Sequence, residues 1–363
     1  MELKRYQIHA LERLSDWFKR LDENNWLPAA AWEMMQFDGP HPSHVTRKDS
    51  SNRPIPHVCL KVPTGGGKTL LAAEALVKSN RRTGLVLWMV PSKAIYDQTK
   101  SAFCDKQHPY RQTLERASGE SVEILEWRPE RRDYFQPGDI ANKLCILLIS
   151  LQSALRSSDP DFLKINQEAG KWSSFFPDED DIQAVRLLRN SYPGLETAKG
   201  RTKRSLANVI KFCRPMIVLD EAHKAYGKKT SELESLVNRF DPSLVLELTA
   251  TPDMNKSNIL VDVRGHDLKD EEMIKLPVSV TGHIDEPWRR VLRQASDDLD
   301  ELKEYADLHF EKTGKYIRPM AVVRVENTGK KERGKGNIHA EDVRKHLTQT
   351  LRIPDDQVKV QSS

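Results

Sequence analysis

The stretch that decides the fold reads VPTGGGKT, from Val62 to Thr69. The apolar segment HVCLKV (57–62) leads into it, and the helical pattern LLAAEALVK (70–78) follows it. A strand, a glycine-rich turn, Lys-Thr and a helix, in that order, are the context of a phosphate-binding loop. Glycines let the backbone approach a ligand closely, and the N–H groups at the start of the helix attract an anion. The stretch therefore predicts a nucleotide site; the alternative is a flexible glycine turn before a basic helix.

The residues expected to hold the nucleotide are Thr64, Gly65, Gly66, Gly67, Lys68 and Thr69. Lys68 is expected to reach the β- and γ-phosphates, and the Thr69 hydroxyl to bind Mg²⁺. The general pattern G-x-x-x-x-G-K-[ST] begins with glycine, where this chain has Val62.

Length and composition favour a protein of about two domains without a membrane segment. The chain has 363 residues, of which 38% are hydrophobic and 30% charged. Its apolar runs, 85–90 and 144–149, are far shorter than the roughly 20 residues of a membrane span. No secretory signal follows Met1, so we expect a cytoplasmic protein. The net charge of +4 permits nucleic-acid binding without requiring it.

Four cysteines are widely and irregularly spaced, which fits neither a zinc site nor a disulfide framework; they are Cys59, Cys104, Cys145 and Cys213. The only metal expected is therefore the Mg²⁺ that accompanies the nucleotide.

Apolar segments alternate with helical patterns along most of the chain. The expected strands include 84–90, 122–127, 144–150, 216–220 and 243–252. This alternation predicts an α/β fold with a doubly wound parallel sheet, in which ligands bind at the carboxyl ends of the strands.

Two parts of the chain depart from this alternation. Residues 156–204 carry an acidic and a basic cluster, and we interpret them as a largely helical insertion that projects from the domain. After residue 285 the pattern is a long charged helix, followed by an expected strand at 318–325 and a short helix. We expect a first domain over 1–285, a linker helix over 286–316 and an incomplete second domain over 317–363.

The segment MIVLD (216–220) ends in DEAH, from Asp220 to His223. An Asp at the end of a buried strand beside a phosphate loop holds Mg²⁺, and Glu221 is placed to orient and deprotonate the attacking water. Without the preceding strand and the phosphate loop, an Asp-Glu pair would indicate only the solvent-exposed start of a helix. The next strand leads to Thr249 and Thr251 in TATP at the same edge of the sheet.

The motifs VPTGGGKT, DEAH and TATP, in that order, resemble those of superfamily 2 helicases and translocases. PSKAIYDQT and ISLQS resemble the nucleic-acid-contacting segments of that superfamily, and KRYQIHAL resembles its N-terminal glutamine motif. Three segments resemble in particular the helicase (Res) subunit of type III restriction endonucleases: VPTGGGKTLLAA, LWMVPSKAIYDQT and VVRVENT. The resemblance covers about residues 3–155 and 216–363.

This resemblance implies two RecA-like domains, with ATP and Mg²⁺ bound to the first. It implies that Gln7 reads the adenine edge, for which a surface helix glutamine is the alternative. It implies that His223, Thr249 and Thr251 couple the nucleotide site to the nucleic acid and the second domain. The implied contacts to nucleic-acid phosphates are Pro91, Ser92, Lys93, Gln98, Ser150, Gln152 and Ser153.

The implied activity is ATP hydrolysis that drives movement along nucleic acid, with DNA favoured over RNA. The implied setting is a restriction or defence system, and the implied partner is a modification or specificity subunit. The sequence departs from the family in one respect. The Q-x-x-G-R-x-x-R pattern that carries the family's arginine finger does not occur in it. No nuclease domain is recognised either, so we expect a fragment that turns ATP over slowly by itself. The alternatives are an RNA helicase with the same core and a truncated ATP-binding module without turnover.

Overall fold

The chain divides into two compact units, Met1–Leu276 and Pro277–Ser363. The computed structural model describes residues 2–119, 121–128, 131–150, 165–225, 237–273, 287–325 and 338–360. The sheet and the phosphate-loop, DEAH and TATP motifs lie in the first unit, whereas the described part of the second unit is helical or irregular.

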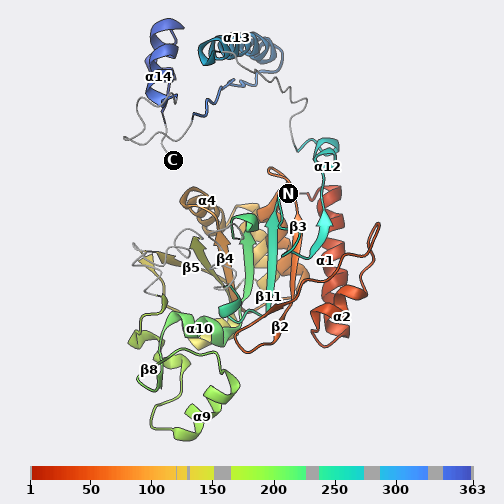
Figure 1. The fold of residues 1–363 in the computed structure, drawn as a ribbon, viewed down its shortest axis with the longest axis vertical. Coiled ribbons are helices and arrows are strands. Elements are labelled where there is room, and N and C mark those ends of the chain that lie inside the picture. Colours follow the sequence, from red (N-terminus) through yellow and green to blue (C-terminus); the bar gives the residue numbers. More distant parts are fainter. Residues whose placement is uncertain are drawn as a thin grey trace. The chain divides into compact units, whose positions relative to one another are not determined.

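The first unit is built on one sheet, shown in Figure 1. Seven of its strands run parallel, and a short eighth strand pairs antiparallel at one edge. In spatial order they are β12 (Ile259–Asp262), β3 (His57–Lys61), β11 (Leu244–Thr249), β10 (Met216–Asp220), β4 (Gly84–Val90), β7 (Leu144–Ser150), β5 (Val122–Arg128) and β6 (Arg131–Arg132). The predicted α/β fold with a doubly wound parallel sheet is confirmed.

The central strands are apolar throughout because both faces of the sheet are covered. In β4, Val86 and Trp88 belong to one buried cluster, while Leu85, Leu87 and Met89 belong to the other. The first cluster includes side chains from α1 (Arg5–Glu23), α2 (Pro28–Glu33), α3 (Lys68–Lys78), α4 (Lys93–Cys104) and α5 (Pro109–Ser118). The second includes side chains from α10 (Leu206–Cys213) and the 3₁₀-helix η1 (Gly170–Phe175).

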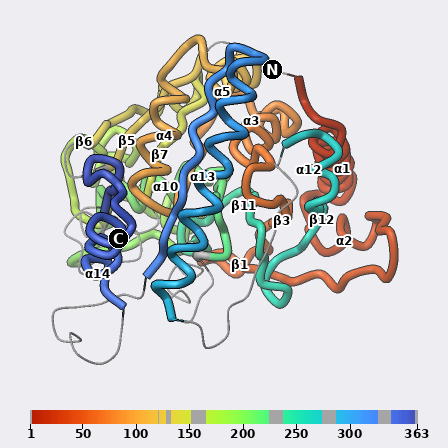
Figure 2. Tube along the Cα trace, turned by 90° about the horizontal axis from the view of Figure 1, so that it is seen from above, coloured from red at the N-terminus to blue at the C-terminus, as the bar shows by residue number. Residues whose placement is uncertain are grey.

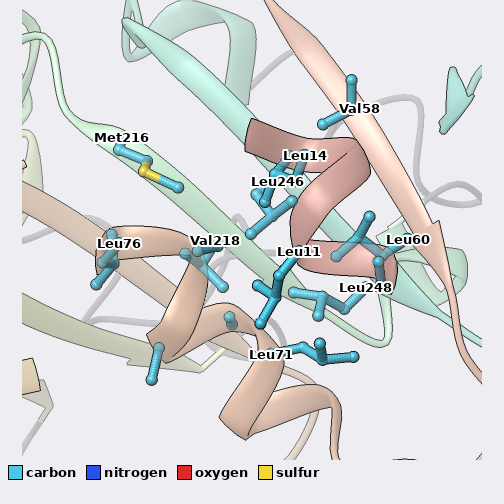
Figure 3. Packing of buried hydrophobic residues seen from close by; sticks show 14 of the residues in the cluster. Leu11, Leu14, Val58, Leu60, Leu71, Leu76, Met216, Val218, Leu246 and Leu248 are labelled. Carbon is cyan, nitrogen blue, oxygen red and sulfur yellow. The ribbon is translucent and has the colours of Figure 1, made fainter. Parts of the chain in front are cut away.

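Figure 3 shows part of the first cluster, in which leucines from α1 and α3 meet the side chains of three strands. Leu11 and Leu14 lie in α1, and Leu71 and Leu76 lie in α3. This packing fixes α3, and with it the phosphate loop at its start, against the sheet.

Smaller elements complete the first unit. They are β1 (Arg47–Lys48), β2 (Pro54–Ile55), α6 (Pro137–Asn142), the 3₁₀-helix η2 (Ala222–Ala225) and α12 (Gly265–Asp270).

A buried polar network fastens the segment before β3 to the sheet. Arg47 and Glu247 form an ion pair of 2.6 Å. Beside it, the side-chain amide of Asn258 lies 3.1 Å from Nε2 of His57, and Nδ1 of His57 lies 3.2 Å from the carbonyl oxygen of Ile55. When Nδ1 carries the proton and donates to Ile55, Nε2 of the neutral imidazole can accept from Asn258.

We expect the stability of the protein to fall as the pH drops below about 6.5, the usual pKa of histidine. Burial, and secondarily the charge of Arg47, hold the pKa of His57 well below that value in the folded protein. Between the two pKa values the unfolded chain binds one more proton than the folded chain, so stability is lost at up to about 1.4 kcal/mol per pH unit. Burial lowers the pKa of His44 too, in the same direction.

The measurement is the free energy of unfolding in urea at pH 7.5, 6.5 and 5.5. The variant His57→Gln removes the main titrating group and should show a flatter profile from a lower starting value. Equal stability of the unmodified protein at all three pH values would contradict the prediction.

The described part of the insertion, residues 165–204, is less helical than predicted, because a hairpin and irregular segments separate its helices; residues 156–164 lie outside the described residues. The described part holds η1, one α-helix, α9 (Ile182–Ser191), and a hairpin of β8 (Thr197–Ala198) and β9 (Arg201–Thr202). Lys199 and Gly200, at the hairpin turn, both have positive φ, which suits a tight two-residue connection. Figure 1 shows α9 and β8 at the end of the first unit opposite α4.

In the second unit, α13 (Trp288–Thr313) forms where the long charged helix was predicted. The strand expected at 318–325 does not form, and Val322 is 93% exposed. A strand needs a neighbour for its backbone hydrogen bonds, and the described residues of this unit contain no other strand. The unit also contains α14 (Ala340–Lys345), a π-helical turn (346–350) and a 3₁₀ turn (355–357).

Throughout the part of the chain that the structure describes, no helix of either unit has enough apolar residues over enough length to cross a bilayer.

Candidate nucleotide and nucleic-acid site

The predicted motifs line up along one edge of the sheet. Strands β3, β11, β10, β4 and β7 are consecutive neighbours and run parallel, so their carboxyl ends form a single row. The residues at or just after these ends are, in that order, the phosphate loop, Thr249 with Thr251, the DEAH residues, Pro91 to Lys93, and Ser150. The structure therefore brings together motifs that are up to about half the chain apart in sequence.

The phosphate loop adopts a conformation that only glycine enters at low cost. Gly65 and Gly67 have φ values of 85° and 74°, and Gly67 is the N-cap of α3. A Cβ atom on Gly67 would lie 2.5 Å from Nε2 of Gln7, and one on Gly66 would lie 2.5 Å from Cγ1 of Val62. Lys68 and Thr69 then begin the helix, whose N-terminal N–H groups suit an anion.

Two side chains from the first turn of α1 form hydrogen bonds with the phosphate loop. Nε2 of Gln7 donates to the carbonyl oxygen of Gly66 over 3.3 Å, and the Tyr6 hydroxyl donates to the same oxygen over 3.0 Å. Burial raises the pKa of Tyr6, which keeps the hydroxyl protonated as a donor. Sequence reasoning found Gln7 but missed Tyr6.

A groove of about 910 Å³ opens beside this turn, between α1, the 36–42 segment, β12 and α12. Its lining includes Arg5, Tyr6, Arg264 and Asp267. Arg5 forms an ion pair of 2.7 Å with Glu271. This volume is within the range of small-molecule sites, and the groove adjoins the phosphate loop through Tyr6.

The DEAH residues contact both the phosphate loop and the TATP segment. Nζ of Lys68 lies 3.0 Å from Oε1 of Glu221, and Nδ1 of His223 lies 3.4 Å from Oε2 of the same carboxylate. Nδ1 of His223 is also 2.9 Å from the Thr249 hydroxyl, which accepts the backbone N–H of Thr251 over 3.2 Å. These contacts form one chain of polar groups across β3, β10 and β11.

Glu221 has a φ of 54°, which is unfavourable for a residue with a side chain. Backbone strain of this kind costs about 1–3 kcal/mol and persists where the surroundings impose it, often at functional sites. Asp220, one residue earlier, is the buried last residue of β10. Burial, and secondarily the negative charge of Asp220, raise the pKa of Tyr110 at the start of α5.

The residues present fit a magnesium ion. Thr69 offers a hydroxyl oxygen and Asp220 a buried carboxylate, and both are hard oxygen donors of the kind Mg²⁺ prefers. Mg²⁺ usually keeps several waters and takes the rest of its ligands from one or two carboxylates and from substrate phosphates. Two protein donors beside a phosphate loop are therefore sufficient.

The predicted nucleic-acid contacts that the structure describes belong to β4, α4 and β7, whose strands are part of the same row. The Ser92 hydroxyl caps α4 by accepting the N–H of Ile95 over 3.4 Å, and Lys93 and Gln98 are exposed on that helix. Pro91 is buried where β4 ends. Ser150 is the last residue of β7, and Gln152 and Ser153 lie outside the described residues.

Comparison with solved structures found a similarity to a chain described as the ATP-dependent type ISP restriction-modification enzyme LlaBIII bound to DNA. The identity is 15% and the TM-score 0.29, over 69% of this chain and 13% of that one. The protein therefore spans only a small part of that enzyme's length. The search of curated proteins found no match.

A protein-family model described as the type III restriction enzyme, res subunit, matches residues 1–254. The match runs through 156–204, which the motif resemblance left out, and it ends before 255–363, which that resemblance included. It includes the phosphate loop, the DEAH residues and the TATP segment. Because it extends over more than half of the chain, the protein belongs to the family of type III restriction enzyme Res subunits.

Proposed function

We propose that the chain binds and hydrolyses ATP with Mg²⁺ and uses the energy to move along DNA. Family membership supports an ATP-dependent function of the helicase type. The observation that carries the proposal is the chain of contacts from Lys68 through Glu221 and His223 to Thr249. It joins the residues proposed for phosphate binding and water activation to a segment proposed to sense the nucleic acid.

In this proposal, Lys68 exchanges its partner when ATP binds. Its ammonium group lies 3.0 Å from the Glu221 carboxylate, and the phosphates compete for the same charge. Transfer of Lys68 to the phosphates releases Glu221, whose carboxylate then takes a proton from the attacking water. Bound Mg²⁺ neutralises phosphate charge, and Thr69 and Asp220 are the residues that would hold it.

His223 and Thr249 are proposed to couple the two sites. The imidazole is held between the Glu221 carboxylate and the Thr249 hydroxyl, so a shift of Glu221 changes the position of Thr249 at the end of β11. Thr251, which is exposed and bonded to Thr249, is proposed to pass this change to the nucleic acid. Pro91, Ser92, Lys93, Gln98 and Ser150 are proposed to contact phosphates, as are Gln152 and Ser153.

The groove beside Tyr6 is proposed to receive the adenine and ribose, with Gln7 reading the edge of the base. In this structure the Gln7 amide donates to the loop carbonyl of Gly66. To read the base, Gln7 must either share its amide between this carbonyl and the adenine edge or turn from one to the other. A first RecA-like domain over 1–285, a linker helix over 286–316 and the remainder over 317–363 stay predictions, as does a modification or specificity partner subunit.

The test is steady-state ATP hydrolysis by this chain with Mg²⁺, alone and with single-stranded DNA, duplex DNA and single-stranded RNA of equal length. Stimulation by DNA above that by RNA is expected. Stronger stimulation by RNA would favour an RNA helicase. Tight binding of Mg-ATP without turnover under any condition would favour an ATP-binding module, and absence of ATP binding would refute the proposal.

A further inference from the structure

A cluster of rings and cations lies where β5 ends, outside every motif discussed above. It consists of Trp127, Arg132, Tyr134, Lys171 and Trp172, and we name it the β5 cluster. Trp127 is near the end of β5, Arg132 is opposite it on β6, and Lys171 and Trp172 come from η1 of the insertion. Arg128 and Arg131 also form a backbone pair in this hairpin.

The position of the β5 cluster extends the row of motifs by one strand. The row runs over β3, β11, β10, β4 and β7, and β5 is the next parallel neighbour of β7. Figure 2 shows β7, β5 and β6 beside α4, the helix that begins with the predicted phosphate contacts Ser92 and Lys93. The β5 cluster therefore lies at the same edge of the sheet as the proposed nucleic-acid contacts.

Its cations are held over aromatic rings that are themselves fixed. Nζ of Lys171 lies 4.5 Å from the ring centroid of Tyr134, and Cζ of Arg132 lies 5.9 Å from that of Trp127. Both rings pack on the buried Trp172, at 4.9 Å for Tyr134 and 6.2 Å for Trp127. A cation over a ring face is attracted by the ring's quadrupole, so it loses less side-chain entropy when it binds an anion.

Two carboxylates near the cluster, Glu126 and Asp133, make contacts with α4 and β5. Glu126, only 2% exposed, accepts the Tyr96 hydroxyl over 3.3 Å and lies 2.9 Å from Nζ of Lys100. Asp133 accepts the backbone N–H of Glu126 over 2.9 Å. Across the ranges that the structure describes, no carboxylate forms an ion pair with Lys171, whose side chain is exposed. Its positive charge is therefore available to an outside partner.

We propose that the β5 cluster binds the phosphate backbone of nucleic acid and extends the contact surface from α4 onto the insertion. This rests on the proposed function, because it assigns further contacts to the same nucleic acid. Lys100 on α4 connects the two surfaces, two helical turns after Lys93 and in contact with Glu126 beside Trp127. The contact is to phosphates and independent of base sequence, since Lys171 already covers the Tyr134 ring face on which a base would stack.

The experiment measures binding of a fluorescein-labelled 30-base-pair duplex DNA by anisotropy, from 50 to 200 mM KCl. The proteins are the unmodified chain and Lys171→Gln. The slope of log K against log [KCl] should become shallower by about 0.9 in the variant, which should also bind several-fold more weakly at 100 mM KCl. Two duplexes of unrelated sequence should show the same loss.

The matched control is Lys199→Gln, which removes one exposed lysine from the same insertion, at the hairpin turn opposite α4. It should keep the slope and affinity of the unmodified chain, and all variants should bind a fluorescent ATP analogue equally. If DNA binds but Lys171→Gln behaves like Lys199→Gln, this inference is wrong while the proposed function stands. If the unmodified chain binds ATP but no DNA, the proposed function fails together with this inference.

Discussion

The variant Glu221→Gln should bind ATP at least as tightly as the unmodified chain and hydrolyse it at least a hundredfold more slowly. The slower turnover follows from the loss of a general base, a contribution typically of 10²–10⁴ in rate. The retained binding follows from the geometry, because the Glu221 carboxylate lies 3.0 Å from Nζ of Lys68. A neutral amide of the same shape no longer competes with the phosphates for that ammonium group.

Two measurements separate these effects. Titration with a fluorescent ATP analogue reports binding, and single-turnover hydrolysis with DNA present reports the chemical step. The comparison variant is Lys68→Met, which removes the phosphate ligand and should lose both binding and turnover. Turnover of Glu221→Gln within threefold of the unmodified chain would exclude Glu221 as the base, and weakened ATP binding by that variant would argue against the exchange of partners by Lys68.

The second large effect is expected from Gly67→Ala, which should weaken ATP binding at least tenfold. Alanine at a φ of 74° costs about 1–2 kcal/mol, and its Cβ would lie 2.5 Å from Nε2 of Gln7. Gln7 must then move away from the Gly66 carbonyl, to which it donates over 3.3 Å. The loop loses its support at the point where α3 begins.

The chain offers a close control for this change. Gly119 follows α5 with a φ of 72°, and a Cβ there meets nothing within 4 Å. Gly119→Ala should therefore lose a similar free energy of unfolding, measured in urea, without any change in ATP affinity. Equal ATP affinity of Gly67→Ala and Gly119→Ala would show that the contact with Gln7 has no role in nucleotide binding.

The sequence by itself was enough to predict the parallel sheet and the phosphate loop. The loop rests on an apolar segment over 57–62, three glycines and a helical pattern over 70–78, and the sheet rests on the alternation of apolar and helical segments. The same holds for the strand that ends at Asp220 and for the one that ends at Thr249. An apolar run bounded by polar residues is a property of a few consecutive residues, so it is visible without knowledge of the rest of the chain.

Local patterns were misleading where a segment needs a distant partner. The run 318–325 has the composition of a strand, yet it is irregular, because no described strand of its unit is available to pair with it. The hairpin at 197–202 was missed, because its strands are two residues each and depend on Asn208, whose side chain accepts the N–H of Glu196 over 2.8 Å.

The tertiary structure alone decided which motifs touch. The order of strands in the sheet places β11 between β3 and β10, so that His223 meets Thr249. The tertiary structure also sets Tyr6 against Gly66, 60 residues later in the sequence, and brings Lys171 over Tyr134. Such contacts depend on how helices and strands pack across the sheet, which burial and long-range backbone pairing determine. The sequence therefore determined which residues are chemically able to act, and the packing of the sheet determined which of them act together.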